Sequence, residues 1–136
     1  MLIHKKIRQK LTSLLKESQI GVNEIYSGRP LFVDIDQEQS AIAVFIDAIQ
    51  AEPVDLCHCE YMADLNIATY LKTAIGEDAL DEIAEKIKKR LESAVENDEL
   101  PDEISEITLS GYEYEQDTTN RTWFVSNLKY QIKYEG

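Results

Sequence analysis

The sequence contains three small groups of residues whose types could support chemistry, and the first is Cys57, His58 and Cys59. Thiolates and imidazoles are zinc ligands, but a structural zinc site usually takes about four of them in paired units. His4 is the only other cysteine or histidine in the chain. Because alternate residues of a strand point to opposite faces, His58 should also lie away from both cysteines. The pattern therefore favours two core cysteines beside a surface histidine over a metal site or a Cys–His nucleophile.

Asp34 and Asp36 have the spacing of paired carboxylates that hold a divalent ion against a phosphate substrate. A two-residue motif arises easily by chance in a chain with 26 acidic residues, so a solvated loop is the favoured interpretation. The five glycines are scattered and form no phosphate-binding loop, and no G-x-S-x-G or H-E-x-x-H signature occurs. We therefore expect a protein that is not an enzyme and has no cofactor.

The third group is a run of carboxylates made of Glu77, Asp78, Asp81 and Glu82. It lies in the first turns of a predicted helix, where negative charge complements the helix macrodipole, so a solvated helix N-terminus is the favoured interpretation. The alternative is a role at a subunit boundary. There, Glu77, Asp78 and Asp81 would bind a divalent ion or repel a neighbour, and Mg²⁺ would affect assembly.

Two stretches have apolar residues at helical spacing. Between Ile3 and Leu15 the apolar positions are separated by lysines and an arginine, which predicts an amphipathic helix with a basic outer face. The second stretch runs from Glu77 to Asn97, and Pro101 prevents its continuation. Its expected core stripe consists of Leu80, Ile83, Ile87, Leu91 and Val95.

Four further segments have the patterns of strands. Residues 41–49 are almost continuously apolar, which predicts a strand buried on both faces. Residues 57–71 alternate, which predicts a long strand with one buried face and one wet or partner-facing face. In the third segment the large apolar residues occupy odd positions at Ile107 and Leu109 but even positions at Tyr112 and Tyr114. The change falls at Ser110-Gly111, which predicts a β-bulge there. A turn from Asp117 to Arg121 then leads into a last strand that should bury Phe124, Leu128, Tyr130, Ile132 and Tyr134.

These elements predict an α+β fold, formed as a single domain over residues 1–136. Two main helices should pack on a mixed or antiparallel sheet of four or five strands. A turn is expected at 26–30, where Gly28 and Pro30 occur.

Composition excludes several classes of function. Apolar residues make up 43% of the chain and charged residues 29%, which is a globular composition. The formal net charge of −12 argues against binding nucleic acid or an anionic membrane. We see no apolar run long enough to span a membrane and no secretory signal. With two closely spaced cysteines and no disulfide framework, we expect a soluble protein of a reducing cytoplasm.

The order of motifs along the chain resembles that of the tail terminator proteins of lambda-like bacteriophages, the minor tail protein U family. The C-terminal part of the resemblance is carried by Ser110-Gly111-Tyr112-Glu113-Tyr114, Trp123, Leu128, Tyr130 and Ile132-Lys133-Tyr134-Glu135. Upstream it is carried by Ile7-Arg8, Gly28-Arg29-Pro30, Ala41-Ile42-Ala43-Val44, Glu77-Asp78 and Leu80-Asp81. The segment from Gln50 to Cys59 departs from the family's pattern.

The resemblance implies a structural role without catalysis. Members of the family form a hexameric ring that caps the growing tail tube, stops its polymerisation and presents the surface to which the head connector joins. The implied partners are further copies of the chain, the tail tube protein and the head–tail connector protein, in a virion tail assembled in the bacterial cytoplasm. An acidic bore would also avoid retaining DNA as it passes.

Candidate contact residues lie in turns and loops, where binding residues are often held by a rigid scaffold. Arg29 is placed to pair with an acidic neighbouring subunit, although an ordinary solvated arginine fits equally well. The loops from Gln50 to Asp55 and from Asp117 to Arg121 are expected to face the tube or the connector. Trp123 opens the last strand on the face opposite Phe124 and is a further contact candidate. For Tyr112 and Tyr114, core packing is favoured over a place in the ring interface.

Two alternatives come from other classes of protein. The high negative charge alone would fit an acidic module that mimics nucleic acid and inhibits a DNA-processing protein, but the acids alternate with lysine and arginine on the second helix. A metal-dependent hydrolase using Asp34, Asp36 and His58 would need tight stoichiometric metal binding. The tail terminator ranks first, the mimic second and the enzyme last.

Overall fold

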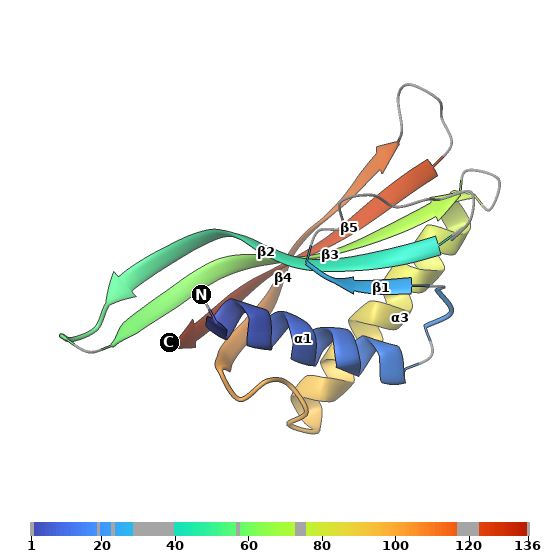
Figure 1. The fold of residues 1–136 in the computed structure, drawn as a ribbon. Coiled ribbons are helices and arrows are strands. Elements are labelled where there is room, and N and C mark those ends of the chain that lie inside the picture. Colours follow the sequence, from blue (N-terminus) through green and yellow to red (C-terminus); the bar gives the residue numbers. More distant parts are fainter. Residues whose placement is uncertain are drawn as a thin grey trace.

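The computed structural model describes residues 2–18, 20–22, 24–28, 40–56, 58–72, 76–116 and 123–135. These ranges form two helices and five strands (Figure 1). In chain order the elements are α1 (Leu2–Glu17), β1 (Glu24–Ser27), β2 (Ser40–Pro53), β3 (Cys59–Lys72), α3 (Glu77–Glu96), β4 (Ile104–Gln116) and β5 (Trp123–Glu135). Among the described residues, no helix is long and apolar enough to cross a membrane.

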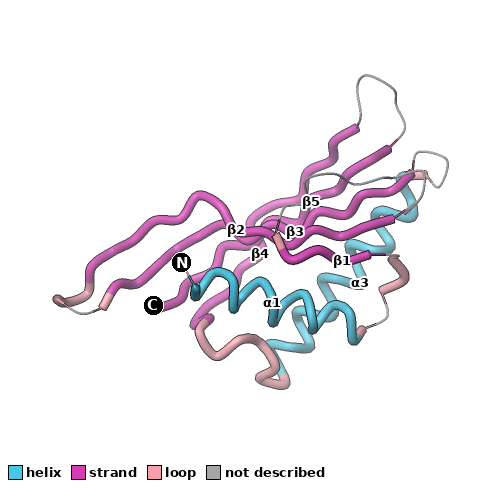
Figure 2. Tube along the Cα trace, viewed as in Figure 1, coloured by secondary structure: helices cyan, strands magenta, loops and turns pink. Residues whose placement is uncertain are grey.

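The strands make one mixed sheet in the order β1-β2-β3-β5-β4. β1 is parallel to β2, and every other neighbouring pair is antiparallel. Both helices lie on the same side of the sheet, which is visible when helices and strands are coloured separately (Figure 2). The predicted α+β class, with two helices on a mixed sheet, is confirmed.

One apolar core fills the space between the helices and this face of the sheet. The predicted stripe of α1 is buried at Ile7, Leu11, Leu14 and Leu15. That of α3 is buried at Leu80, Ile83, Ile87 and Leu91, but its fifth member is not, since Val95 is 53% exposed. Val95 lies in the last turn of α3 and flanks a groove of about 140 Å³ between that helix and β4. The helical period correctly predicted the direction in which Val95 points, but the sheet does not extend far enough to cover its side chain.

The last strand follows its predicted alternation on the core face. Leu128, Tyr130, Ile132 and Tyr134 are all buried, and Phe124 is partly buried against the core. The bulge predicted in β4 is also confirmed, because the register between β4 and β5 shifts between Leu109 and Gly111. The extra residue changes the parity, so Tyr112 faces the helices as Ile107 does before the bulge.

The prediction of a wet second face on β3 is wrong in the middle of the strand. Asn66 and Ala68 point away from the helices, yet they are only 2% and 3% exposed. Asn66 donates from Nδ2 to Asp47 Oδ1 at 2.9 Å and accepts from Asn127 Nδ2 at 3.0 Å. These hydrogen bonds link β2, β3 and β5 and satisfy the amide that is buried at the centre of this face.

β1 was not expected, because the sequence predicts a turn at 26–30 that overlaps the last two of its four residues, and no strand before that turn. It pairs with Ala41–Val44 of β2, and Gly28 directly after it has a φ of +92°. The amide of Gly28 donates to the carbonyl of Val44 at 2.7 Å. The turn residues therefore begin only after a short parallel strand, and a residue with a Cβ would be strained at position 28.

Candidate functional site

The distal part of the β2–β3 hairpin is the feature of the fold most suited to contact another protein. We call residues 48–56 and 58–60 the arm. Every residue from Ala48 to Leu56 is exposed, although Ala48–Pro53 belong to a paired strand. Both faces of this part of β2 are therefore in solvent. Figure 1 shows the hairpin extending past the N-terminal end of α1.

A bulge turns the arm away from the body. The register between β2 and β3 shifts between Asp47 and Gln50, and Ala48 has a φ of +50°, which is unusual for a residue with a side chain. β1 pairs with β2 only as far as Val44, so the outer edge of the arm lies beyond that strand. The prediction that 41–49 is buried on both faces thus holds for Ala41–Val44 and is wrong from Ala48 onward.

The predicted loop from Gln50 to Asp55 is largely strand. Gln50 pairs with Met62, and Pro53 pairs with Cys59, so the connection itself is only the short turn at 54–58. Hydrophobic content predicted the strand's start but not its length, because alternation is lost where neither face is covered. Both Gln50 and Asp55 nevertheless lie on the arm, exposed to solvent.

The turn at the end of the arm contains the histidine of the Cys-His-Cys group. Asp55 Oδ1 accepts from the backbone amide of His58 at 2.9 Å and lies 2.9 Å from its Nδ1, so the carboxylate holds the turn together. Cys59 is half-buried and free, and Cys57 lies outside the described residues. Cys59 is therefore not the core cysteine that was expected, because the hairpin ends beyond the core.

The acidic start of α3 is arranged around one carboxylate. Asp81 Oδ1 accepts from the hydroxyl of Tyr112 at 3.0 Å and from that of Tyr114 at 2.5 Å. The two rings lie 4.8 Å apart between centroids, and Tyr114 is 54% exposed, so the core packing expected for both holds for Tyr112 alone. Burial, together with these contacts, raises the pKa of Tyr112 well above its ordinary value.

Metal ligands do not converge at this point. Among the described residues, no three histidine, cysteine, aspartate or glutamate side chains lie close enough together to hold an ion. Glu77, Asp78 and Asp81 are exposed side chains of the first turns of α3. These carboxylates can attract cations to the surface, and Asp81 also accepts hydrogen bonds from two tyrosines.

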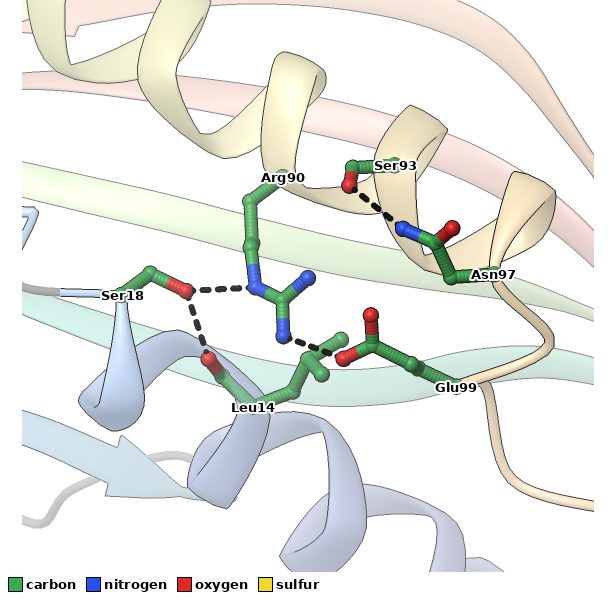
Figure 3. Close-up of polar contacts among 6 residues, drawn as sticks. All are labelled: Leu14, Ser18, Arg90, Ser93, Asn97 and Glu99. Carbon is green, nitrogen blue, oxygen red and sulfur yellow. Dashed lines mark hydrogen bonds and ion pairs between the residues drawn. The ribbon is translucent and has the colours of Figure 1, made fainter.

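A polar clamp fixes α1 against α3 (Figure 3). Arg90 donates from Nε to Ser18 Oγ at 2.7 Å and from Nη2 to Glu99 Oε2 at 2.7 Å. Ser18 in turn donates to the carbonyl of Leu14 at 2.8 Å. The hydrogen bond from Arg90 lowers the pKa of Glu99. The guanidinium therefore joins the end of one helix to the segment that follows the other.

The other end of α1 is held by an ion cluster. Glu103 lies 2.8 Å from Lys6 Nζ and 3.3 Å from Lys10 Nζ. The hydrogen bond from Lys6, with further help from Lys10, lowers the pKa of Glu103 to about 2. With the clamp at Arg90, these contacts set the orientation of the basic outer face of α1.

Several sequence candidates fall outside the described residues. These are Arg29, Asp34, Asp36, Asp117 and Arg121. The backbone of Trp123 is described as the first residue of β5, paired with Lys72. Sequence reasoning missed the arm as a projecting strand. No local signal in the sequence marks it, because the bulge between Asp47 and Gln50 is visible only in the strand register.

Three comparisons with known proteins agree with one another. A family model described as phage minor tail protein U matches residues 2–134. The tail tube terminator protein of Escherichia phage lambda is 26% identical over 132 residues, which cover 97% of this chain and 98% of that protein. A solved chain from the virion of a native gene transfer agent (GTA) particle matches with a TM-score of 0.57 and 10% identity, covering 96% of this chain and 92% of that one. At that identity the structural match shows a common fold.

Proposed function

The chain belongs to the phage minor tail protein U family, and on that premise we propose that it is the tail terminator of a phage or prophage. The observation that carries the proposal is the relationship to the lambda tail tube terminator along 97% of the chain. A similar fold in a chain of a virion particle is consistent with it. A family of structural tail proteins fits the expectation that the chain is not an enzyme, and the nucleic-acid mimic gains no support.

In the proposed role, six copies form a ring on the end of the tail tube and the ring stops further addition of tube protein. The opposite side of the ring then joins the connector of the head. Six chains of −12 carry a formal charge of −72, which disfavours spontaneous association and leaves assembly sensitive to ionic strength. We therefore expect Mg²⁺ to promote assembly by screening this charge. The surface carboxylates Glu77, Asp78 and Asp81 are the candidates for binding the ion.

The experiment that tests the function removes the gene from the phage or prophage that encodes this chain and supplies the protein from a plasmid. Without the protein, electron microscopy should show tubes of uncontrolled length and heads without joined tails. Tails of normal length should return with the plasmid, but not with the same plasmid carrying an early stop codon. Normal tails in the deleted phage would contradict the proposal.

A further inference from the structure

The arm concentrates exposed apolar side chains. Of the seven large apolar side chains that are exposed among the described residues, three lie on it: Ile49, Val54 and Leu56. Leu56 is fully exposed at the turn, and Val54 is 60% exposed. Single exposed apolar residues need no explanation, but three on one projecting hairpin indicate a surface that is buried in an assembly.

The arm carries three acidic side chains, Glu52, Asp55 and Glu60, and no lysine or arginine. Glu52 lies directly opposite Glu60, and Glu60 lies directly opposite Glu135 of β5, so three glutamates form a row across the sheet. Like charges directly opposite each other destabilise a strand pair. No lysine or arginine occurs between Pro30 and Lys72 to offset them. A cationic partner would relieve this repulsion, whereas nucleic acid and anionic lipid would add to it.

The chain itself carries a surface of the complementary kind. α1 has five basic residues and one acidic residue, and no acidic residue occupies its first turn. Lys5 and Lys6 stand near the N-terminus of the helix, where the macrodipole already makes positive charge unfavourable. Lys5 and Lys16 are exposed and form no ion pair with another described residue. Leu2 is 82% exposed and adds an apolar side chain at the N-terminal end of α1.

We propose that the arm of one copy lies along the outer face of α1 of a second copy. This rests on the proposed function, and it names the contact that would link neighbouring subunits. The exposed part of β2 spans about 20 Å and α1 about 24 Å, so the two elements match in length. Glu52 and Glu60 face the lysines of α1, while Val54 and Leu56 cover apolar surface. Because arm and helix are different surfaces, the contact is head-to-tail and a closed ring uses every arm once.

Charge reversal tests the contact. The arm variant is Glu52→Lys with Glu60→Lys, the helix variant is Lys5→Glu with Lys16→Glu, and a third chain carries all four changes. Each variant is compared with the wild type by light scattering and negative-stain microscopy over a range of protein and Mg²⁺ concentrations. We expect each double variant to need an at least about tenfold higher protein concentration to form rings. The third chain should recover, because its reversed arms meet reversed helices.

The arm variant separates this contact from general repulsion. Its two changes move the formal net charge from −12 to −8, so repulsion between copies falls and assembly would improve if only net charge mattered. The matched control is Glu92→Lys with Glu96→Lys, which makes the same change of charge on exposed positions of α3. The control should assemble at least as well as the wild type. Thermal unfolding of every variant establishes that it is folded.

The outcomes also separate this inference from the proposed function. Rings from the arm variant at wild-type concentrations, or failure of the third chain to recover, would overturn the contact between arm and helix. If the wild type is monomeric in solution, the same four chains are scored by their rescue of tail length in the deleted phage. Loss of rescue by the arm variant without recovery in the third chain would assign the arm to the tube or connector instead. The proposed function fails if the wild type does not rescue tail length, or if the deleted phage makes normal tails without it.

Discussion

Two buried tyrosines of β5 should differ in how their stability responds to loss of the hydroxyl group. Tyr134 is 0% exposed, and its hydroxyl lies 2.5 Å from Nε2 of His4, which is itself buried. Tyr130 is 6% exposed, and its hydroxyl is buried without a hydrogen-bond partner among the described residues. Burial raises the pKa of both to about 12, so both hydroxyls are protonated at neutral pH.

The expected magnitudes follow from these contacts. Tyr134→Phe removes a buried hydrogen bond and leaves the imidazole of His4 unpaired, which should lower the free energy of unfolding by about 1–3 kcal/mol. Tyr130→Phe removes a hydroxyl that makes no hydrogen bond, so its stability should stay the same or rise by about 1 kcal/mol. The two variants make the same chemical change in the same strand, and their free energies of unfolding should therefore differ by about 1–4 kcal/mol.

Urea unfolding monitored by circular dichroism measures both effects. At pH 8 the His4 imidazole is neutral in the folded and unfolded chains, so protonation does not contribute. Tyr114→Phe, which removes the hydrogen bond of an exposed tyrosine to Asp81, shows for comparison what the loss of a solvent-exposed hydrogen bond costs. The reasoning is refuted if Tyr134→Phe is as stable as the wild type, or if Tyr130→Phe loses as much stability as Tyr134→Phe.

Three further predictions concern pH and assembly. Burial, then the charges of the chain N-terminus and Arg8, lowers the pKa of His4 below its ordinary 6.5, so the unfolded chain binds the proton more tightly. Its contribution to stability should be complete above pH 6.5 and decrease as the pH falls toward the folded pKa; His4→Gln should flatten the unfolding free energy measured between pH 5 and 8. Arg29→Glu should block assembly while the monomer stays folded, and unchanged assembly in complementation would remove Arg29 from the contact surface. Shortening the loop 117–121 should abolish tail capping, and infectious tails of normal length from that variant would exclude this loop.

The periodicity of the sequence was sufficient for every element except β1, and for the direction of most side chains. Both helices and the long strands were predicted, as was the bulge at Ser110-Gly111. Period reports which way a side chain points, and this depends only on local backbone geometry. It does not report whether another layer covers that side. Val95 and Asn66 show the two failures, since the first is exposed on a core-facing stripe and the second is buried on a face expected to be wet.

The candidate site, too, was predicted from the sequence only in part. Gln50 and Asp55 were chosen from the sequence as contact residues, and both lie on the exposed arm. The sequence assigned them to a loop, because the bulge that makes this part of β2 project is not visible in the hydrophobic pattern. For the same reason, the face-to-face glutamates Glu52 and Glu60 could be recognised only once the strand register was known.

By itself, the sequence determined the two helices, the sheet that they cover, the acidic charge and the family resemblance, all of which depend on residue type and local spacing. Tertiary structure decided which distant groups meet. His4 contacts Tyr134 across 130 positions of the chain, and Arg90 contacts Ser18 across 72. It also decided that one hairpin extends beyond the core with both faces in water. Such contacts arise when separate elements pack together, and no local pattern encodes how far that packing reaches.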